Sequence, residues 1–440
     1  MNDSFDRRSL HRVLPIAMAA ALALGAAAVT PPIASDPPAA PGAFAVELVG
    51  DGRGAIATWI EPRETGAAIR FSRFDPAADP PWTAPRTVAD RSDLFANWAD
   101  RPAVRRLADG SLLAHDLRKI AAGTYAYGVR LSRSTDDGES WQDLGWLHDD
   151  TRAVEHGFVS MVPVDGGMLA VWLDGREMPE QAAGDGHGHG HDAAGGAMTL
   201  RTATLHAELP APSEPVASTG LDGRVCECCA TDAVLTSEGP IVVYRDRGPN
   251  EERDIFIVRR DGSRWTSPMP VARDGWIMPG CPVNGPAVDA IGAQVCVAWF
   301  TAAAGDPDDP SPPRTLAARS VDGGATFGPP LELSTTGLGR TDVVMLPSGD
   351  AIACWVDRTT PATGLAASLP PKKDRGSIAL RRVRRDGSLG ETVFVVPMSP
   401  GRMAGFPRLL RLDGPEPKLL LAWRDEDSDR LRAMLVEPPA

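Results

Sequence analysis

Four cysteines of this chain have types and spacing suited to chemistry. Cys226, Cys228 and Cys229 lie within four residues of one another, and Cys281 lies further along the chain. Thiolates bind soft or borderline metal ions such as Cu(I) and Zn(II), and Met278 lies close to Cys281, so a metal site is one interpretation. Two disulfide bridges are a second, because exported chains commonly pair their cysteines. Redox chemistry or a free thiol is a third.

Histidines extend this set of candidate ligands. His148 and His156 precede the cysteines, and His187, His189 and His191 alternate with glycine in a short tract. Glycine between imidazoles makes a flexible loop that could gather a metal ion but cannot hold an exact geometry. A solvated low-complexity insertion is the alternative interpretation of the tract. We predict a soft-metal site formed by the cysteines with help from histidine, for copper or alternatively zinc, and no other cofactor.

Arginines recur at one position of a repeated pattern, each close to an acidic residue. They are Arg63, Arg118, Arg176, Arg247, Arg358 and Arg424. Pairing with the neighbouring acids is one interpretation of this recurrence. The other is a ring of inward guanidinium groups that binds a carboxylate. The candidate binding residues for that ring are Arg176, Arg247, Arg358 and Arg424.

The elements that must position these residues follow from a repeat. A short apolar run ending in a landmark residue, usually aromatic, recurs at Trp59, His115, Trp172, Tyr244, Trp299, Trp355 and Trp423. The intervals of 56, 57, 72, 55, 56 and 68 residues indicate one repeated unit with two insertions. Each unit reads as four short strands joined by hairpin turns, which predicts an all-β propeller with seven four-stranded blades. Cys296 and Cys354 are offset by an odd number from their landmark Trp, which predicts that they pack between blades.

Two turns between third and fourth strands share the pattern Ser-x-Asp-x-Gly-x-Ser/Thr-aromatic. Its residues are Ser134, Asp136, Gly138 and Trp141 in one turn and Ser320, Asp322, Gly324 and Phe327 in the other. The Asp accepts backbone N–H groups, and the Gly supplies a positive φ. This is the Asp-box, or BNR repeat, and the chain resembles the secreted β-propellers of the bacterial sialidase superfamily. Sialidases have six blades, so a six-bladed ring is the alternative to seven.

The resemblance also carries an expectation about activity. It implies arginines that clamp a carboxylate, a Tyr nucleophile with a Glu partner in a late blade, and an Asp acid/base in an early one. Tyr125, Tyr127 and Tyr244 are the three tyrosines, and none lies in a late blade. We therefore expect a propeller that binds a ligand or soft metal ion without sialidase activity, and we assign no catalytic residue. An exo-sialidase-like glycoside hydrolase acting on acidic sugars is the alternative.

Strand direction sorts these residues between two faces. In a four-stranded blade, the second-to-third turn and the link to the next blade lie on one face, whereas the third-to-fourth turn lies on the other. The cysteines and histidines fall in links and second-to-third turns. We predict that they share a face near the axial mouth, opposite the Asp-box turns.

Charge limits the partners of the chain. Its 440 residues carry a formal net charge of −13, which argues against sequence-independent binding to nucleic acid or to an anionic membrane surface. Carbohydrate, a small ligand or a periplasmic protein are the partners that we consider, and we expect a monomer.

The N-terminal segment predicts export. An apolar run follows Arg7-Arg8, so residues 1–29 read as a Sec or twin-arginine signal peptide, or as an uncleaved membrane anchor. Residues 30–42 read as a Pro/Ala linker, and residues 43–440 as a single propeller domain that is periplasmic or secreted. The last unit shows only three strands, which predicts that the ring closes with a strand from residues near 40.

Overall fold

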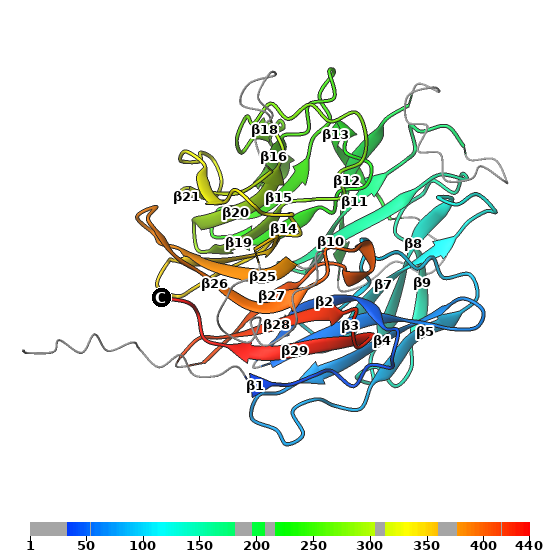
Figure 1. Ribbon diagram of the computed structural model, residues 1–440. Helices are drawn as coiled ribbons and strands as arrows, with labels where there is room; N and C mark the ends of the chain where they lie inside the picture. Colours follow the sequence, from blue (N-terminus) through cyan, green and yellow to red (C-terminus); the bar gives the residue numbers. More distant parts are fainter. Residues whose placement is uncertain are drawn as a thin grey trace, which may run out of the picture. The chain divides into compact units, whose positions relative to one another are not determined.

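The computed structural model describes residues 33–52, 54–180, 196–206, 216–303, 313–359, 376–414 and 416–440. In these residues the strands form seven antiparallel sheets, and the helical content is one short 3-10 helix, η2 (Arg402–Ala404). The sheets are the blades of a seven-bladed β-propeller (Figure 1). The predicted all-β fold with seven blades is confirmed, and the six-bladed alternative is wrong.

Six blades are built from consecutive strands. Blade 1 contains β2 (Phe44–Asp51), β3 (Gly54–Pro62), β4 (Ala67–Phe74) and β5 (Arg86–Arg91). Blade 2 contains β6 (Ala103–Arg106), β7 (Leu112–Lys119), β8 (Tyr127–Ser134) and β9 (Gln142–Trp146). Blade 3 contains β10 (His156–Val164), β11 (Gly167–Asp174), β12 (Met198–His206) and β13 (Thr219–Val225). Blade 4 contains β14 (Asp232–Thr236), β15 (Gly239–Arg245), β16 (Ile255–Asp261), β17 (Arg264–Trp265) and β18 (Met269–Pro270).

The remaining strands complete the ring. Blade 5 contains β19 (Ala287–Ile291), β20 (Gln294–Thr301), β21 (Arg314–Ser320) and β22 (Leu331–Ser334). Blade 6 contains β23 (Asp342–Met345), β24 (Ala351–Asp357), β25 (Gly376–Val383) and β26 (Leu389–Met398). Blade 7 contains β27 (Arg408–Leu412), β28 (Lys418–Asp425) and β29 (Arg430–Val436) together with β1 (Ile33–Ala34).

Strand β1 closes the ring from the beginning of the chain. It pairs antiparallel with β29, with Ile33 opposite Leu435, so the N-terminal and C-terminal strands share one sheet (Figure 1). The Asp36 carboxylate accepts hydrogen bonds from Arg432 and from the backbone N–H of Ala433. Because β1 falls inside residues 30–42, part of the segment that reads as a linker belongs to the propeller sheet. Closure by a borrowed strand hides an edge that would otherwise be exposed.

The apolar core is divided among the contacts between blades. Seven clusters of buried residues occur, and each combines side chains from two neighbouring blades. Cys296 belongs to the cluster between blades 5 and 6, and Cys354 to the one between blades 6 and 7; both are fully buried. Their predicted place between blades is confirmed.

The landmark residues occupy equivalent positions, each on the second strand of its blade. The indole N–H of Trp59 donates to Glu61 at 2.9 Å, and Trp172 and Trp355 make the same bond to the acid two residues later, both at 2.8 Å. A buried indole N–H needs a partner, and the acid at the end of the strand supplies one. The aromatic-x-acid pair is therefore a packing device of blades 1, 3 and 6, whereas Trp299 of blade 5 donates to Asp274 and Tyr244 of blade 4 donates to Asp222.

The two Ser-x-Asp-x-Gly turns have the same hydrogen-bond pattern. The Asp136 carboxylate accepts hydrogen bonds from Ser134 Oγ, from the Ser140 backbone N–H and from Ser140 Oγ. Asp322 accepts the equivalent bonds in the turn between β21 and β22. These turns join third to fourth strands, so alternating strand direction puts them on the face opposite the links between blades.

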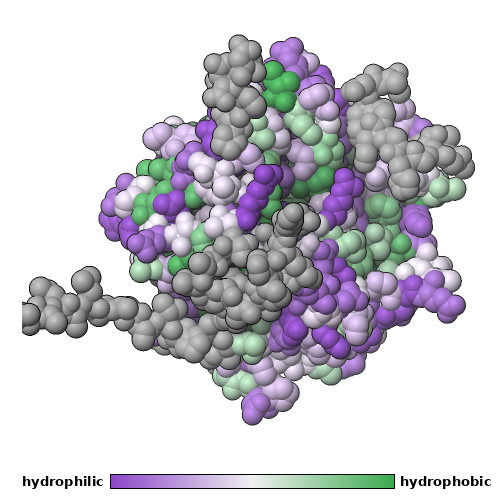
Figure 2. All heavy atoms as spheres, in the orientation of Figure 1, coloured by the Kyte–Doolittle hydropathy of each residue, from purple (hydrophilic) through white to green (hydrophobic). Residues whose placement is uncertain are grey.

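On the face drawn in Figure 2, hydrophilic side chains are spread across the described residues, and hydrophobic ones occur in groups between them. Among the described residues, no helix is long and apolar enough to span a bilayer.

Candidate functional site

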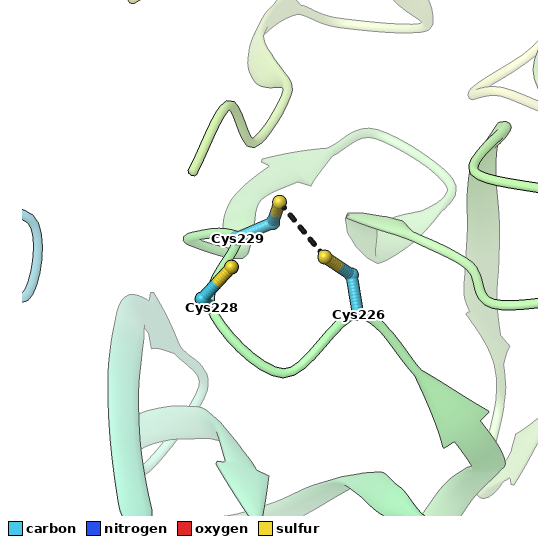
Figure 3. Close-up of side chains that lie close together, drawn as sticks. All are labelled: Cys226, Cys228 and Cys229. Carbon is cyan, nitrogen blue, oxygen red and sulfur yellow. Dashed lines mark hydrogen bonds between the residues drawn. The ribbon is translucent and has the colours of Figure 1, made fainter. Parts of the chain in front are cut away.

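The four cysteines of the predicted cluster meet at one end of blade 4. Cys226, Cys228 and Cys229 lie in the turn between β13 and β14, and Cys281 lies in the link between β18 and β19. Cys228 and Cys281 form a disulfide with a Cα–Cα distance of 6.1 Å. Cys226 and Cys229 are free thiols, and their Sγ atoms are 3.0 Å apart. The Sγ atoms of Cys226, Cys228 and Cys229 all lie within 4.8 Å of one another, with those of Cys226 and Cys228 directed toward Cys229 (Figure 3).

Local backbone contacts explain this convergence. The Cys226 N–H donates to the carbonyl of Arg245, which anchors the start of the turn to β15. The tight turn that follows brings the side chains of Cys226 and Cys229 together. On the other side, a Cβ at Gly285 would lie 2.0 Å from the carbonyl oxygen of Ala230. Glycine at this position therefore lets the link that carries Cys281 approach the cysteine turn.

Charged side chains surround the cluster. Glu227, only 2% exposed, accepts hydrogen bonds from Arg247 and from Arg253, the latter at 3.2 Å. Arg247 and Arg253 also pair with Glu251 at 2.8 and 2.7 Å. Each carboxylate is matched by guanidinium groups, so this part of the site is an ion-pair network that fixes the turn.

The two free thiols have opposite electrostatic settings. Burial raises the pKa of Cys226 well above its ordinary value, and the adjacent Cys229 sulfur adds to the rise. Burial alone would also raise the pKa of Cys229, but the Cys226 S–H, Arg245, the Asn284 backbone N–H and Arg253 together lower it below the usual thiol value. Cys229 is therefore the sulfur that carries negative charge most readily, with Cys226 as its S–H donor.

The predicted histidine ligands do not join the cysteines. His148, in the link between blades 2 and 3, and His156, the first residue of β10, stack on each other with ring centroids 3.8 Å apart. His148 accepts from the Val129 N–H and donates to the Asp150 carbonyl, and burial lowers its pKa to about 3. Among the described residues, the group of three or more metal-ligand side chains whose ligand atoms converge consists of cysteines alone. Met278 is half-buried on the same link as Cys281, and His187, His189 and His191 lie outside the described residues.

Three of the four arginines of the predicted ring pair with local acids. Arg176 pairs with Asp174 and Asp149, both at 2.8 Å, and Arg247 belongs to the network around Glu227. Arg424 donates to Asp429 at 2.5 Å and to two backbone carbonyls, whereas Arg358 is exposed. Arg176, Arg247 and Arg424 therefore follow the first interpretation of the sequence, in which the arginines pair with neighbouring acids.

A different set of charged residues lines the axis. A cavity of about 50 Å³ is bounded by residues of blades 1, 2, 3, 4 and 7 and by residues of the links that precede blades 5 and 6, with space for only a few water molecules. Glu47 bridges Arg101 at 2.7 Å and Arg408 at 2.9 Å, and these two arginines lower its pKa to about 2 although burial acts to raise it. Arg105 and His115 add two further nitrogen groups to the wall.

Three polar atoms in the wall of this cavity have no protein partner. They are Asp100 Oδ1, Arg105 Nε and His115 Nδ1. Burial raises the pKa of Asp100 to about 7, although its other oxygen accepts from the Phe158 N–H at 2.7 Å. Strand position is the feature of the sequence that could have indicated these residues. Glu47, Arg105 and Arg408 lie on innermost strands, which face the axis of a propeller. Composition and motif gave no sign of them.

A tyrosine–glutamate pair lies next to this wall. Tyr127 donates a hydrogen bond to Glu155, and Phe95 stacks on the Tyr127 ring at 3.9 Å. The Tyr127 side chain is fully buried, and burial raises its pKa well above the ordinary value. A phenol enclosed in this way can position Glu155, but it is not exposed to a substrate.

Comparison with known proteins identifies the fold and no family. No protein-family model matches the chain, and no curated protein matches it. An ulvan lyase of polysaccharide lyase family PL25 is similar in structure, with a TM-score of 0.52, 11% identity and coverage of 93% of this chain and 96% of that one. A protein of unknown function from Dyadobacter fermentans has a TM-score of 0.50 at 12% identity, covering 93% and 98% of the two chains. These similarities establish the propeller architecture alone.

Proposed function

We propose that this chain is an exported β-propeller that binds a soft monovalent metal ion, copper(I), through Cys226 and Cys229, and that it is not a glycoside hydrolase. The observation that carries the proposal is the pair of buried free thiols, 3.0 Å apart, with a third sulfur within 4.8 Å of both. Sulfur ligands that converge to this degree match the preference of Cu(I) for thiolates.

The number of free thiols favours Cu(I) over Zn(II). Structural zinc sites take four protein ligands, and here the Cys228–Cys281 bridge leaves two thiols available. Two thiolates can bind a monovalent ion in a linear arrangement, for which the sulfurs would separate to about 4.6 Å at metal–sulfur distances of about 2.3 Å. Arg245 and Arg253 act on the Cys229 sulfur and would offset the negative charge of a dithiolate complex.

The disulfide supports export. Disulfides persist mainly in oxidising compartments, and Cys228–Cys281 joins the two links that flank blade 4. The apolar run that follows Arg7-Arg8 agrees with this compartment.

Glycoside hydrolysis of the sialidase type fits the structure poorly. Tyr127, which has a Glu partner as a sialidase-type nucleophile would, is fully buried. The axial cavity of about 50 Å³ holds a few water molecules and has no room for a sugar ring. The ulvan lyase similarity keeps carbohydrate as a ligand to be tested, and release of a fluorophore from a sialyl conjugate tests the hydrolase alternative directly.

The experiment is a Cu(I) competition titration under argon, with a chromophoric Cu(I) chelator and ascorbate, which maintains Cu(I) while leaving the disulfide intact. We expect one Cu(I) per chain, and at least a hundredfold loss of affinity in Cys226→Ser and in Cys229→Ser. Cys296→Ser is the matched control, because Cys296 is an equally buried free thiol within the blade core. Equal affinities in wild type and the two cluster variants would refute the proposal.

A further inference from the structure

The four clustered cysteines differ in their access to solvent. Cys226 and Cys229, the free thiols, are 0% and 1% exposed. Cys228 and Cys281, which form the bridge, are half-buried. The chain therefore holds a reduced pair in the interior and an oxidised pair nearer the surface, with Cys228 within 4.8 Å of both interior sulfurs.

We propose that these cysteines form an internal thiol–disulfide relay, in which the bridge moves from Cys228–Cys281 to Cys226–Cys229 and presents two thiols at the surface. The substrate class of the exposed pair is a disulfide of another protein or of a small thiol compound. The relay requires no bound metal ion, so it stands apart from the Cu(I) proposal.

The first exchange involves Cys229 and Cys281. The Cys229 sulfur lies within 4.8 Å of Cys228 Sγ, which is bonded to Cys281, so the interior thiol is next to the bridge that it attacks. Attack of the Cys229 thiolate on Cys281 Sγ forms a Cys229–Cys281 bond and breaks the Cys228–Cys281 bond. Cys228 leaves as a thiolate and takes up the proton that Cys229 lost. Attack on Cys228 instead would require a disulfide between adjacent residues.

The second exchange completes the transfer. The Cys226 thiolate attacks Cys229 Sγ, its neighbour at 3.0 Å, forming a Cys226–Cys229 bond and breaking the Cys229–Cys281 bond. Cys281 leaves as a thiolate and takes up the proton from Cys226. One disulfide and two thiols are present before and after, so the rearrangement needs no external oxidant or reductant.

Transfer to a partner uses the same chemistry. The half-buried Cys228 and Cys281 thiols pass two electrons and two protons to an external disulfide, which is reduced to a dithiol while the Cys228–Cys281 bridge forms again. The chain then contains two bridges, and a reducing dithiol is needed to restore the starting state. The interior pair in this scheme is a store of two reducing equivalents.

The test is alkylation of the native protein with light iodoacetamide, in chelator and without metal, on chains that carry one bridge. Unfolding in heavy iodoacetamide without reductant follows, and each labelled cysteine and each remaining bridge is assigned by non-reducing peptide mass mapping. We expect light label on Cys228 and Cys281 in the wild type, with Cys226–Cys229 recovered as the bridge. Recovery of Cys228–Cys281 as the only bridge after prolonged alkylation would overturn the relay.

Two variants separate the steps. Cys226→Ser blocks the second exchange, so it should trap a Cys229–Cys281 bridge with light label on Cys228. Cys229→Ser blocks the first exchange, so it should keep the Cys228–Cys281 bridge unlabelled. A Cys229→Ser variant that labels like the wild type would refute the relay.

Cys296 and Cys354 serve as internal controls, because both are fully buried. They should carry heavy label alone. Light label on them would show that global opening exposes the cysteines, and this result would also overturn the relay. Because no metal is present, a relay that fails leaves the Cu(I) titration to be judged separately, and the converse also holds.

Discussion

Asp100 should make this protein less stable as pH rises from about 4 to about 7. Its side chain is 2% exposed, and Oδ1 has no hydrogen-bond partner. Burial raises its pKa from 3.8 to about 7, while the Phe158 N–H and Arg101 act in the opposite direction. The folded state thus holds a proton that the unfolded chain releases from about pH 4 upward. Each pKa unit corresponds to about 1.4 kcal/mol, so the full cost above pH 7 is of order 4 kcal/mol.

The perturbation is Asp100→Asn, which keeps the size of the side chain and the acceptor for the Phe158 N–H but cannot ionise. Urea unfolding at constant ionic strength, from pH 4 to pH 9, measures the free energy of unfolding of both proteins. The stability of the wild type relative to Asp100→Asn should fall by up to about 1.4 kcal/mol per pH unit between pH 4 and pH 7. Above pH 7 the variant should be the more stable protein, with a constant difference.

The control is Asp90→Asn, because the Asp90 side chain is 55% exposed and makes one long contact with Arg63, at 3.3 Å. Its unfolding free energy should follow that of the wild type across the whole range. Parallel curves for the wild type and Asp100→Asn between pH 4 and pH 8 would refute the assignment of a buried, protonated Asp100.

Three further substitutions test other parts of the structure. Glu47→Gln removes the negative charge that pairs with Arg101 and Arg408. Because these arginines lower the pKa of Glu47 from 4.5 to about 2, the charge stabilises the fold above pH 4.5, and this stabilisation is lost as pH falls toward 2. Urea unfolding at pH 7 should show that the variant loses about 3 kcal/mol of unfolding free energy. Asp322→Ala removes the acceptor for Ser320 and Thr326, so calorimetry should show a Tm lower by a few degrees while Cu(I) affinity is unchanged. Lost Cu(I) affinity at unchanged Tm would contradict the assignment of the Ser-x-Asp-x-Gly turns and the cysteines to opposite faces. Ser35→Pro deletes the N–H that donates to the Ala433 carbonyl at 2.9 Å, so limited proteolysis should release the N-terminal segment faster; equal rates would argue against closure by β1.

The sequence was sufficient to predict the fold because the repeat is enforced by a local packing requirement. A second-strand aromatic whose N–H needs a buried acceptor selects an acid two residues later, as in Trp355 and Asp357, and this pair can be read directly from the chain. Closure was harder to place, because Ile33 and Ala34 lie in a segment rich in proline and alanine. The missing fourth strand of blade 7 is what indicates β1. The residues of β1 themselves show no strand pattern.

The candidate site was only partly predictable. Position in a link was enough to place Cys226, Cys228, Cys229 and Cys281 near one another, but which sulfurs bond depends on side-chain directions within a single tight turn. The histidines show the same limit: His148 lies in a neighbouring link and His156 begins β10, yet their rings stack on each other and do not join the cysteine group. The alternation of strand direction assigns a residue to one face of the propeller, whereas contacts between residues on the same face depend on the paths of the links.

The position of the disulfide gives the cysteine turn a role in the ring as well as in chemistry. Cys228 precedes β14 and Cys281 follows β18, so the bridge, with a sequence separation of 53 residues, encloses blade 4. The Cys226–Cys229 bridge of the relay would enclose only the turn and leave the two ends of blade 4 held by noncovalent contacts. In the proposed relay, the same turn therefore holds blade 4 covalently while its interior thiols stay reduced, or releases that tie while the thiols of Cys228 and Cys281 become free.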